Sequence, residues 1–315
     1  MNIKSFNKKV RNRAITIVRR FVQVIAFLLI NYIILELIFS INLLSLENLI
    51  KVLPILNSPR NPISNGAGIL EYIFFFIADG IVPLLLIAVL IIVILFTNRV
   101  FCGWICPIGT FQDACAAIPT KKRSIKPSTH KSLLKIKYVF VILIIIIIIP
   151  LGATKIGNPL FYEDYKTNLG AMAEKPMGYF SLSEFIFVFF PNLIGQMIAS
   201  GGIQPLFSNF IVFIVFVFYI ILIILSVWYP RVYCRYICPF AAVASLVSEY
   251  SFLKLSRNPV KCVGRTECGI CERVCPKQIR ILDEPFEFFT GKGECNLCLK
   301  CKELCPYGAI DLKFR

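Results

Sequence analysis

The chain has 315 residues, of which 57% are hydrophobic, and its net charge at pH 7 is +16. Its 28 phenylalanines and long isoleucine runs exceed what a soluble core requires, and they predict a membrane protein. The basic residues alternate with apolar stretches, as in loops that face lipid head groups, so we do not expect nucleic-acid binding.

Four apolar stretches reach bilayer length or nearly so, and they predict a mainly α fold built on a four-span transmembrane helical bundle. They cover residues 21–42, 72–97, 137–154 and 208–228. Lysine and arginine are dense in residues 1–20 and 98–137 and sparse in 43–71 and 155–207. Because positively charged loops stay in the cytoplasm, we expect a multi-pass protein of the cytoplasmic (inner) membrane with both termini inside.

Two acids, Glu36 and Asp79, lie inside predicted spans. Intramembrane carboxylates are costly and by default indicate a role, such as accepting a proton when a quinol is oxidised. Alternatively, both reach the outer interface or hydrogen-bond to Asn31 or Gln23. The residues leave both interpretations open.

A fifth apolar stretch, about 182–200, begins with a Ser-Leu-Ser-Glu capping box and ends at a Gly-Gly pair, which predicts a helix. If this helix crossed the membrane, Cys106 and Cys238 would lie on opposite sides of it. Because the sequences around these two cysteines match, an interfacial or re-entrant helix is the preferred interpretation, with a span as the alternative.

That match is an internal repeat. Arg99-Val-Phe-Cys-Gly-Trp-Ile-Cys-Pro recurs as Arg231-Val-Tyr-Cys-Arg-Tyr-Ile-Cys-Pro, at an offset of 132 residues. Each copy follows the cytoplasmic end of a span, so we expect two parallel helical-hairpin repeats, about 21–120 and 135–250. Their axis would bring the two C-x3-C-P motifs face to face.

Four thiolates would then become available, from Cys102, Cys106, Cys234 and Cys238. Soft ligands of this kind can hold a third iron–sulfur site or a copper site. The alternative is a buried turn whose cysteines act as small apolar residues. Cys115 has Val247 as its repeat counterpart and is expected to be an ordinary buried thiol.

The chain has one histidine, His130, which excludes bis-histidine haem b, and it is expected to be a solvated loop residue. Neither G-x-G-x-x-G nor a Walker A motif occurs in the sequence, so no nucleotide cofactor is indicated.

Eight cysteines near the C-terminus form two runs, each ending in Cys-Pro, and the second run is C-x2-C-x2-C-x3-C-P. This spacing is typical of two 4Fe–4S clusters, in which the fourth cysteine of each run serves the other cluster. The rule assigns Cys262, Cys268, Cys271 and Cys305 to one cluster, and Cys275, Cys295, Cys298 and Cys301 to the other. Structural zinc on the same thiolates is the alternative.

The first run has a five-residue gap before Cys268, so the loop there is longer than the standard one. Residues 279–282 and 309–312 follow the two Cys-Pro pairs and are predicted to be strands of a small sheet. Because ligand thiolates require a reducing compartment, the tail should face the cytoplasm.

The expected organisation has three parts: a cytoplasmic basic N-terminus (1–20), a transmembrane domain with two C-x3-C-P repeats (21–254), and a small α+β two-cluster ferredoxin module (255–315).

With both motifs and the tail in view, the chain resembles the NapH/MauN-type polytopic membrane ferredoxins. The same core occurs in the membrane part of NosR and in CcoG/RdxA-type proteins. The resemblance covers about residues 15–315. It implies an electron-transfer subunit, quinol dehydrogenase-like, that couples a quinol pool or a cytoplasmic donor to redox enzymes. NapH-like proteins serve nitrate reduction, MauN-like ones amine dehydrogenase maturation and CcoG-like ones copper reduction, and the sequence does not select among them.

The leading hypothesis is therefore a membrane-bound iron–sulfur relay to a partner redox enzyme. The alternative is a copper-handling assembly factor that uses the four C-x3-C-P thiolates. A third reading is a passive anchor whose clusters are structural.

Overall fold

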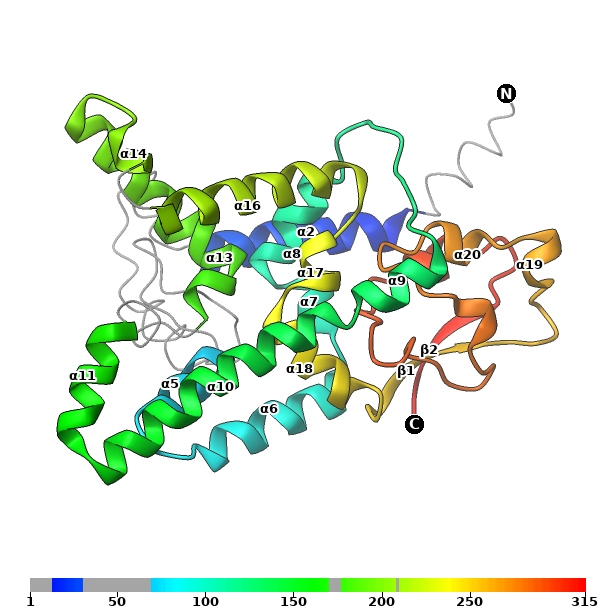
Figure 1. Cartoon of the computed structure of the whole chain (residues 1–315). Coiled ribbons are helices and arrows are strands. Elements are labelled where there is room, and N and C mark those ends of the chain that lie inside the picture. The colour runs from blue at the N-terminus through cyan, green and yellow to red at the C-terminus, as the bar shows by residue number, and fades with distance from the viewer. Residues whose placement is uncertain (1–12, 31–68, 170–176, 208–209) are drawn as a thin grey trace. The chain divides into compact units, whose positions relative to one another are not determined.

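The computed structural model describes residues 13–30, 69–169, 177–207 and 210–315, and these are mainly helical with a small two-stranded sheet (Figure 1). The α-helices are α2 (Ala14–Ile30), α5 (Ile69–Ala78), α6 (Leu84–Thr97), α7 (Val100–Trp104), α8 (Pro107–Cys115), α9 (Pro127–Leu133), α10 (Ile136–Gly157), α11 (Pro159–Leu169), α13 (Leu182–Glu184), α14 (Phe190–Ser200), α15 (Gln204–Phe207), α16 (Phe210–Trp228), α17 (Val232–Tyr236), α18 (Pro239–Ser248), α19 (Gly264–Glu267), α20 (Ile270–Arg273) and α21 (Lys300–Glu303). Short 3₁₀ turns are η1 (Gly178–Phe180) and η3 (Ile281–Asp283), a π turn is η2 (Phe185–Phe189), and the strands are β1 (Leu253–Arg257) and β2 (Ile310–Phe314).

The chain divides into two compact units. Unit 1 consists of residues 1–27, 91–110 and 243–315, and unit 2 consists of residues 28–90 and 111–242. Unit 1 therefore holds the first C-x3-C-P motif together with the cysteine-rich tail, whereas unit 2 holds the second motif.

Three helical segments in the described part of the chain are long and apolar enough to cross a membrane: Pro127–Gly157, Leu182–Ser200 and Phe210–Trp228. The predicted spans 137–154 and 208–228 correspond to the first and third of these segments. Helix α2 covers the start of the predicted span 21–42, whose remainder, with Glu36, lies outside the described residues.

The predicted span 72–97 is not one continuous helix, and its crossing of the membrane stays a prediction. Helix α5 ends at Ala78 and α6 begins at Leu84, so two shorter apolar helices replace one long helix. The break contains Gly80, whose φ of 79° is in the left-handed region, and Pro83, which lacks the N–H that a continuing helix needs. A hydropathy window counts apolar residues and does not detect this turn.

The segment 182–200 is helical, as predicted. The Ser181 hydroxyl accepts a hydrogen bond from the Glu184 N–H at 3.4 Å, and Gly201 ends the helix in the left-handed conformation. By length and composition this segment is among the candidate spans. Its re-entrant placement stays a prediction.

In unit 2, helix α10 has one buried face and one exposed face. Ile144, Ile148 and Leu151 are 1% exposed, whereas Ile146 and Ile149 are 60% and 56% exposed. An apolar face of this kind suits contact with lipid, because a helix satisfies its own backbone hydrogen bonds there.

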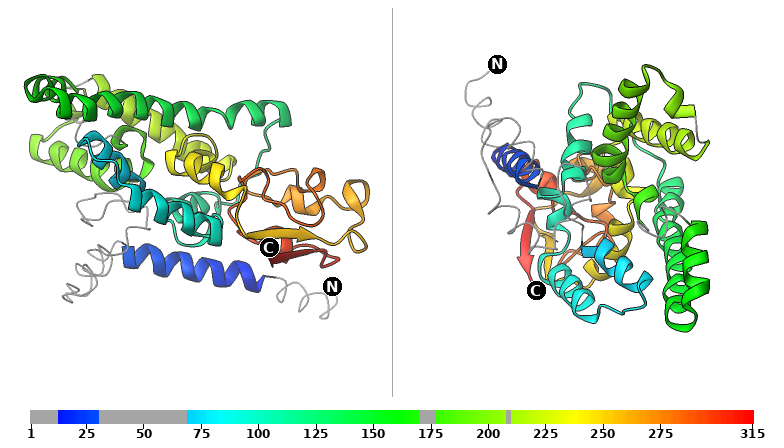
Figure 2. Two further views of the ribbon diagram at one scale, coloured as in Figure 1. Left: turned by 90° about the horizontal axis from the view of Figure 1, so that it is seen from below. Right: turned by 90° about the vertical axis from the view of Figure 1, so that its left-hand side faces the viewer.

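The tail sheet differs from the prediction. Strand β2 pairs antiparallel with β1, and Leu312 lies opposite Leu255; the pair is seen in the left view of Figure 2. Residues 279–282 do not form a strand: Ile279 and Ile281 instead pack into the apolar core of the tail beside Cys271 and Cys301. Their alternation therefore serves burial against the cysteines rather than strand pairing.

Candidate iron–sulfur centres

The eight tail cysteines line two cavities in unit 1. Cys262, Cys268, Cys271 and Cys305, called quartet 1, line one cavity. Cys275, Cys295, Cys298 and Cys301, called quartet 2, line the other. The empty space in each cavity, including the part open to solvent, is about 340 Å³. The structure thus brings together the same two groups of four that the spacing predicts.

The two quartets are built by matching turns. Gly269 follows Cys268 with φ 58°, and Leu299 follows Cys298 with φ 56°. Each is the N-cap residue of a one-turn helix, α20 or α21, that carries the next cysteine. This left-handed step turns two successive thiols toward one cavity. Leucine tolerates it poorly, which indicates a locally constrained loop.

The donor chemistry fits an iron–sulfur cluster. All thirteen cysteines lie in the described residues, and none of them is joined in a disulfide there. In that part of the chain, no three histidine, cysteine, aspartate or glutamate side chains converge closely enough to hold a single metal ion. Four soft thiol donors arranged around a cavity match a multi-atom cluster better than one tetrahedral ion.

Burial controls the protonation of the quartet thiols. It raises the pKa of Cys271 to about 11 and the pKa of Cys295 to about 12, and neighbouring thiolates add to the effect. Burial also raises the pKa of Cys301 well above its usual value. Without metal these thiols hold their protons at neutral pH, and metal ligation replaces the protons.

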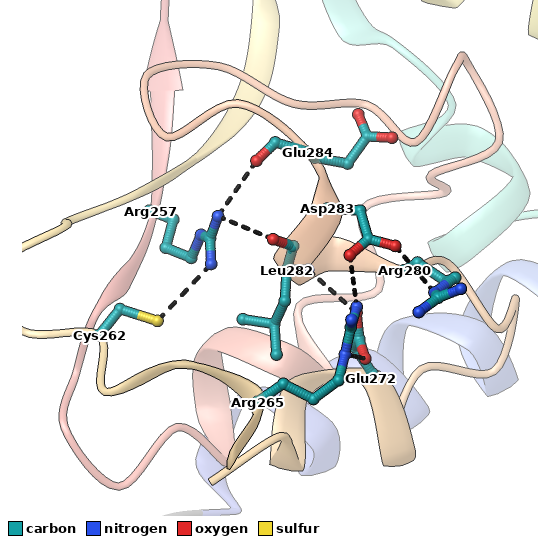
Figure 3. Close-up of polar contacts among 8 residues, drawn as sticks. All are labelled: Arg257, Cys262, Arg265, Glu272, Arg280, Leu282, Asp283 and Glu284. Atoms are coloured by element: carbon teal, nitrogen blue, oxygen red, sulfur yellow. Dashed lines mark hydrogen bonds and ion pairs between the residues drawn. The ribbon is translucent and has the colours of Figure 1, made fainter. Parts of the chain in front are cut away.

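A guanidinium lies in the wall of the quartet 1 cavity. Arg257, at the end of β1, lines this cavity, and its Nη1 lies 3.8 Å from the Cys262 Sγ. Figure 3 shows the side chain reaching from its strand toward that sulfur. The Ala309 N–H donates to the Cys305 Sγ at 3.3 Å. Hydrogen bonds to ligand sulfurs are a main means by which proteins tune cluster potential.

The first C-x3-C-P motif, residues 102–107 (motif 1), lies against the loop of quartet 2 within unit 1. The Trp104 indole N–H donates to the Leu297 carbonyl at 2.9 Å. A Cβ added to Gly103 would lie 2.2 Å from the Asn296 carbonyl oxygen, so only glycine allows this approach. Asn296 and Leu297 separate two quartet 2 cysteines, so motif 1 touches the ligand loop itself.

A buried arginine strengthens this contact. The Arg99 Nη1 donates to the Gly293 carbonyl at 2.9 Å and lies 3.2 Å from the Glu294 carboxylate. Glu294 directly precedes Cys295 in the chain. Lys277 lies 4.0 Å from the same carboxylate. Two cations, Arg99 and Lys277, therefore share one acid, Glu294, which lies next to the quartet 2 residue Cys295 in the chain.

The second motif, residues 234–239 (motif 2), is held inside unit 2. The Gln112 side-chain N–H donates to the Cys234 Sγ at 2.9 Å, and its carbonyl oxygen accepts from the Tyr233 N–H at 3.1 Å. The Tyr233 hydroxyl donates to the Phe180 carbonyl at 2.9 Å. Motif 2 is therefore fixed by side chains from distant segments of its own unit.

His130 is not a solvated loop residue. It lies on α9, and its Nδ1 is 2.7 Å from the Tyr236 hydroxyl and 3.3 Å from the Arg235 guanidinium. Tyr236 and Arg235 stand in motif 2 where motif 1 has Trp104 and Gly103. The prediction for His130 failed because nothing near it in sequence reveals these partners.

Cys115 is half-buried, and burial raises its pKa.

The four C-x3-C-P cysteines are divided between the units: Cys102 and Cys106 belong to unit 1, and Cys234 and Cys238 belong to unit 2. A centre shared by all four stays a prediction.

Asp79, at the α5–α6 break, forms an ion pair with Lys155 of α10.

Sequence reasoning missed the residues that support the cysteines, namely Arg257, Glu294 and Gln112. The recurrence of Arg99 and Arg231 in the two repeats indicated that these arginines support the motifs. Their acidic partners could not be predicted, because they are distant in sequence.

Two segments of the chain, residues 79–126 and 210–258, match a protein family described as "4Fe-4S binding domain". Each segment contains one C-x3-C-P motif, and both quartets lie outside the matched segments. The matches therefore support iron–sulfur binding by the repeated part of the chain.

Several curated proteins are similar to the chain. A protein of Methanocaldococcus jannaschii, MJ0749, is 28% identical over 239 residues, which cover 75% of this chain and 74% of that protein. YccM of Escherichia coli, named for electron transport, is 25% identical over 71% of this chain and 53% of its own length. The regulatory protein NosR of Stutzerimonas stutzeri is 22% identical over 72% of this chain and 26% of its own length. No solved structure matches the chain significantly.

Proposed function

We propose that this chain relays electrons between a quinol pool or cytoplasmic donor and a partner redox enzyme. Its similarity to YccM, a protein named for electron transport, and to NosR, whose core the sequence resembles, supports this proposal, as do the two segments that match a 4Fe–4S binding family. The observation that carries this proposal is the arrangement of eight thiols, as two quartets, around two cavities of one compact unit. Two 4Fe–4S clusters held there would supply one-electron chemistry with little rearrangement of ligands.

Motif 1 supports a route between this pair of centres and the rest of the protein. It follows the apolar helix α6, and its Gly103 and Trp104 contact the loop that separates two quartet 2 cysteines. Because electron transfer slows steeply with distance, such contact favours quartet 2 as the centre next to motif 1. Quartet 1, with three of its four cysteines only half-buried, is then the centre open to a partner.

We propose that Cys102, Cys106, Cys234 and Cys238 form a third centre. Both motif segments match a family described as binding 4Fe–4S, which supports iron–sulfur over copper at these thiolates. The Gln112 N–H aimed at the Cys234 Sγ suits a sulfur that carries negative charge as a ligand.

Membrane orientation and proton coupling complete the proposal. The basic loops, and the thiolates that cluster ligation requires, support an inner-membrane protein with its tail in the cytoplasm. Of the two predicted intramembrane acids, Asp79 lies within the described residues, and it forms an ion pair with Lys155. A step in which Asp79 accepts a proton would have to break this ion pair.

The test is anaerobic purification of the full chain in detergent, followed by metal analysis and low-temperature EPR. We expect about eight irons from the tail, with acid-labile sulfide and signals after dithionite reduction. A sample that contains zinc and little iron would overturn the relay. EPR signals that appear after reduction with dithionite but not with menadiol would exclude a quinol as the electron donor and leave a cytoplasmic donor.

A further inference from the structure

The guanidinium of Arg257 is clamped in the wall of the quartet 1 cavity. Its Nη2 donates to the Glu284 carbonyl at 3.1 Å and to the Leu282 carbonyl at 3.3 Å. The Phe286 ring covers it, with 4.1 Å from the ring centroid to the Arg257 Cζ. The residue is 6% exposed, so the charge lies in a site of low dielectric.

The clamp leaves the cation aimed at the thiol. Nη1 lies 3.8 Å from the Cys262 Sγ, while Nε is buried without a hydrogen-bond partner among the described residues. The acids nearby are turned elsewhere. Arg265 binds both Glu272, at 2.9 Å, and Asp283, at 2.6 Å. Figure 3 shows the Glu284 carboxylate directed away from the Arg257 guanidinium.

The charge of Arg257 is therefore held close to quartet 1 without a carboxylate to balance it. When a centre at quartet 1 accepts one electron from a one-electron donor, its negative charge increases by one and no proton is needed. A buried cation stabilises the reduced form more than the oxidised form, because the attraction grows with the charge on the centre.

We infer that Arg257 is a positioning residue that sets the reduction potential of the centre at quartet 1 and leaves the centre at quartet 2 unchanged. Quartet 2 has its own charges, Arg99 and Lys277 sharing Glu294, and apart from Asn296 its cavity is lined by apolar side chains and cysteines. The inference rests on the proposed cluster binding and names a residue whose charge makes the partner-facing centre easier to reduce than it would be without that charge.

The test is an EPR-monitored redox titration of the full chain. Cys268→Ser and Cys298→Ser variants assign the signals, because each should remove the signal of one quartet. Arg257→Gln should lower the ratio of reduced to oxidised quartet 1 centre about tenfold at a fixed potential, which is ~59 mV for one electron. Arg257→Lys keeps the charge but loses the planar fork, so its shift should be smaller.

Arg265→Gln is the matched control. It removes the same charge from the same region, but Arg265 is exposed and paired with two acids, so solvent screens it. It should leave both potentials unchanged. Equal shifts in Arg257→Gln and Arg265→Gln, a shift of both centres, or no shift would overturn the inference.

Two further measurements keep the outcomes separate. Iron and sulfide content of the wild-type chain test the proposed function, and a chain without two reducible centres overturns both proposals. If Arg257→Gln loses iron, the Arg257→Lys titration decides. Iron retained in Arg257→Lys, with a quartet 1 potential close to the wild-type value, would support the role of the charge. Loss of iron in this variant as well would show that the guanidinium only holds the loop through its bonds to the Leu282 and Glu284 carbonyls, and would overturn the inference.

Discussion

Arg231 and Asp113 form a buried bidentate ion pair that ties motif 2 to α8. The Arg231 Nε lies 2.9 Å from Oδ1 of Asp113, and its Nη2 lies 2.7 Å from Oδ2. Arg231 has φ 58°, in the left-handed region that arginine rarely adopts. The ion pair therefore holds a strained turn three residues before Cys234. Its repeat counterpart, Arg99, is equally buried but pairs with Glu294, so the repeated arginines anchor the two motifs to different partners.

Removal of the Asp113 carboxylate should destabilise unit 2 strongly. Asp113→Ala removes the acid from a buried ion pair, and the loss of one partner of such a pair typically costs about 3–5 kcal/mol. Thermal unfolding in detergent measures the loss. The control is Asp311→Ala, which breaks an exposed pair with Lys302 and should cost about 0–1 kcal/mol. Equal unfolding temperatures for the two variants would contradict the structural role of the pair.

The Gln112 side chain should control what motif 2 binds. Gln112→Glu keeps the size and the acceptor for the Tyr233 N–H, but it replaces the donor to Cys234 with a negatively charged oxygen. Loss of such a supporting hydrogen bond usually lowers metal affinity about 10–100-fold. We expect iron beyond the tail's content to fall while the tail EPR signals persist.

Gln204→Glu, at an exposed position of α15, is the control for this change and should keep the full iron content. If Gln112→Glu instead removes the tail signals and spares the remaining iron, motif 2 does not hold a separate centre.

Local patterns predicted much of the candidate site. The turns that carry Cys268 and Cys271, or Cys298 and Cys301, involve residues within a few positions of each other, so spacing alone indicated a shared cavity. The capping box at Ser181 likewise depends on a neighbour three residues away. Such features need no knowledge of the rest of the fold.

Features that depend on distant partners were not predictable. Arg99 was visible as a repeated residue, but Glu294 lies 195 positions further along the chain. The apolar alternation of Ile279 and Ile281 is compatible with a strand or with burial beside cysteines, and only the tail core selects burial. The Gly80 turn breaks a stretch whose composition alone predicts one helix.

Gly103 should be essential for the contact between motif 1 and quartet 2. In Gly103→Ala, the added methyl group would lie 2.2 Å from the Asn296 carbonyl oxygen, so the two segments must separate. Overpacking of this kind typically costs about 1–3 kcal/mol. We expect a lower unfolding temperature and a changed EPR line shape for the quartet 2 centre, with the quartet 1 signal unaltered.

Gly195→Ala is the matched control, because a Cβ added there meets nothing within 4 Å. It should behave like the wild type. A quartet 2 signal that is identical in Gly103→Ala and Gly195→Ala would show that motif 1 does not support the quartet 2 loop.

Release of iron from the tail should be favoured by acid. Burial holds the pKa of Cys271 at about 11 and that of Cys295 at about 12 in the metal-free tail, so these thiols take up protons when iron leaves at neutral pH. Because protons compete with iron below these pKa values, the loaded form gains stability as pH rises toward 11, by about 1.4 kcal/mol per pH unit for each proton exchanged. Anaerobic transfer of iron to a ferrous chelator at pH 6, 7 and 8 should therefore decrease with pH. The control is Cys115→Ser, which removes a thiol outside the quartets and should keep this pH profile. A release of iron that does not depend on pH would mean that the quartet thiols are not the ligands.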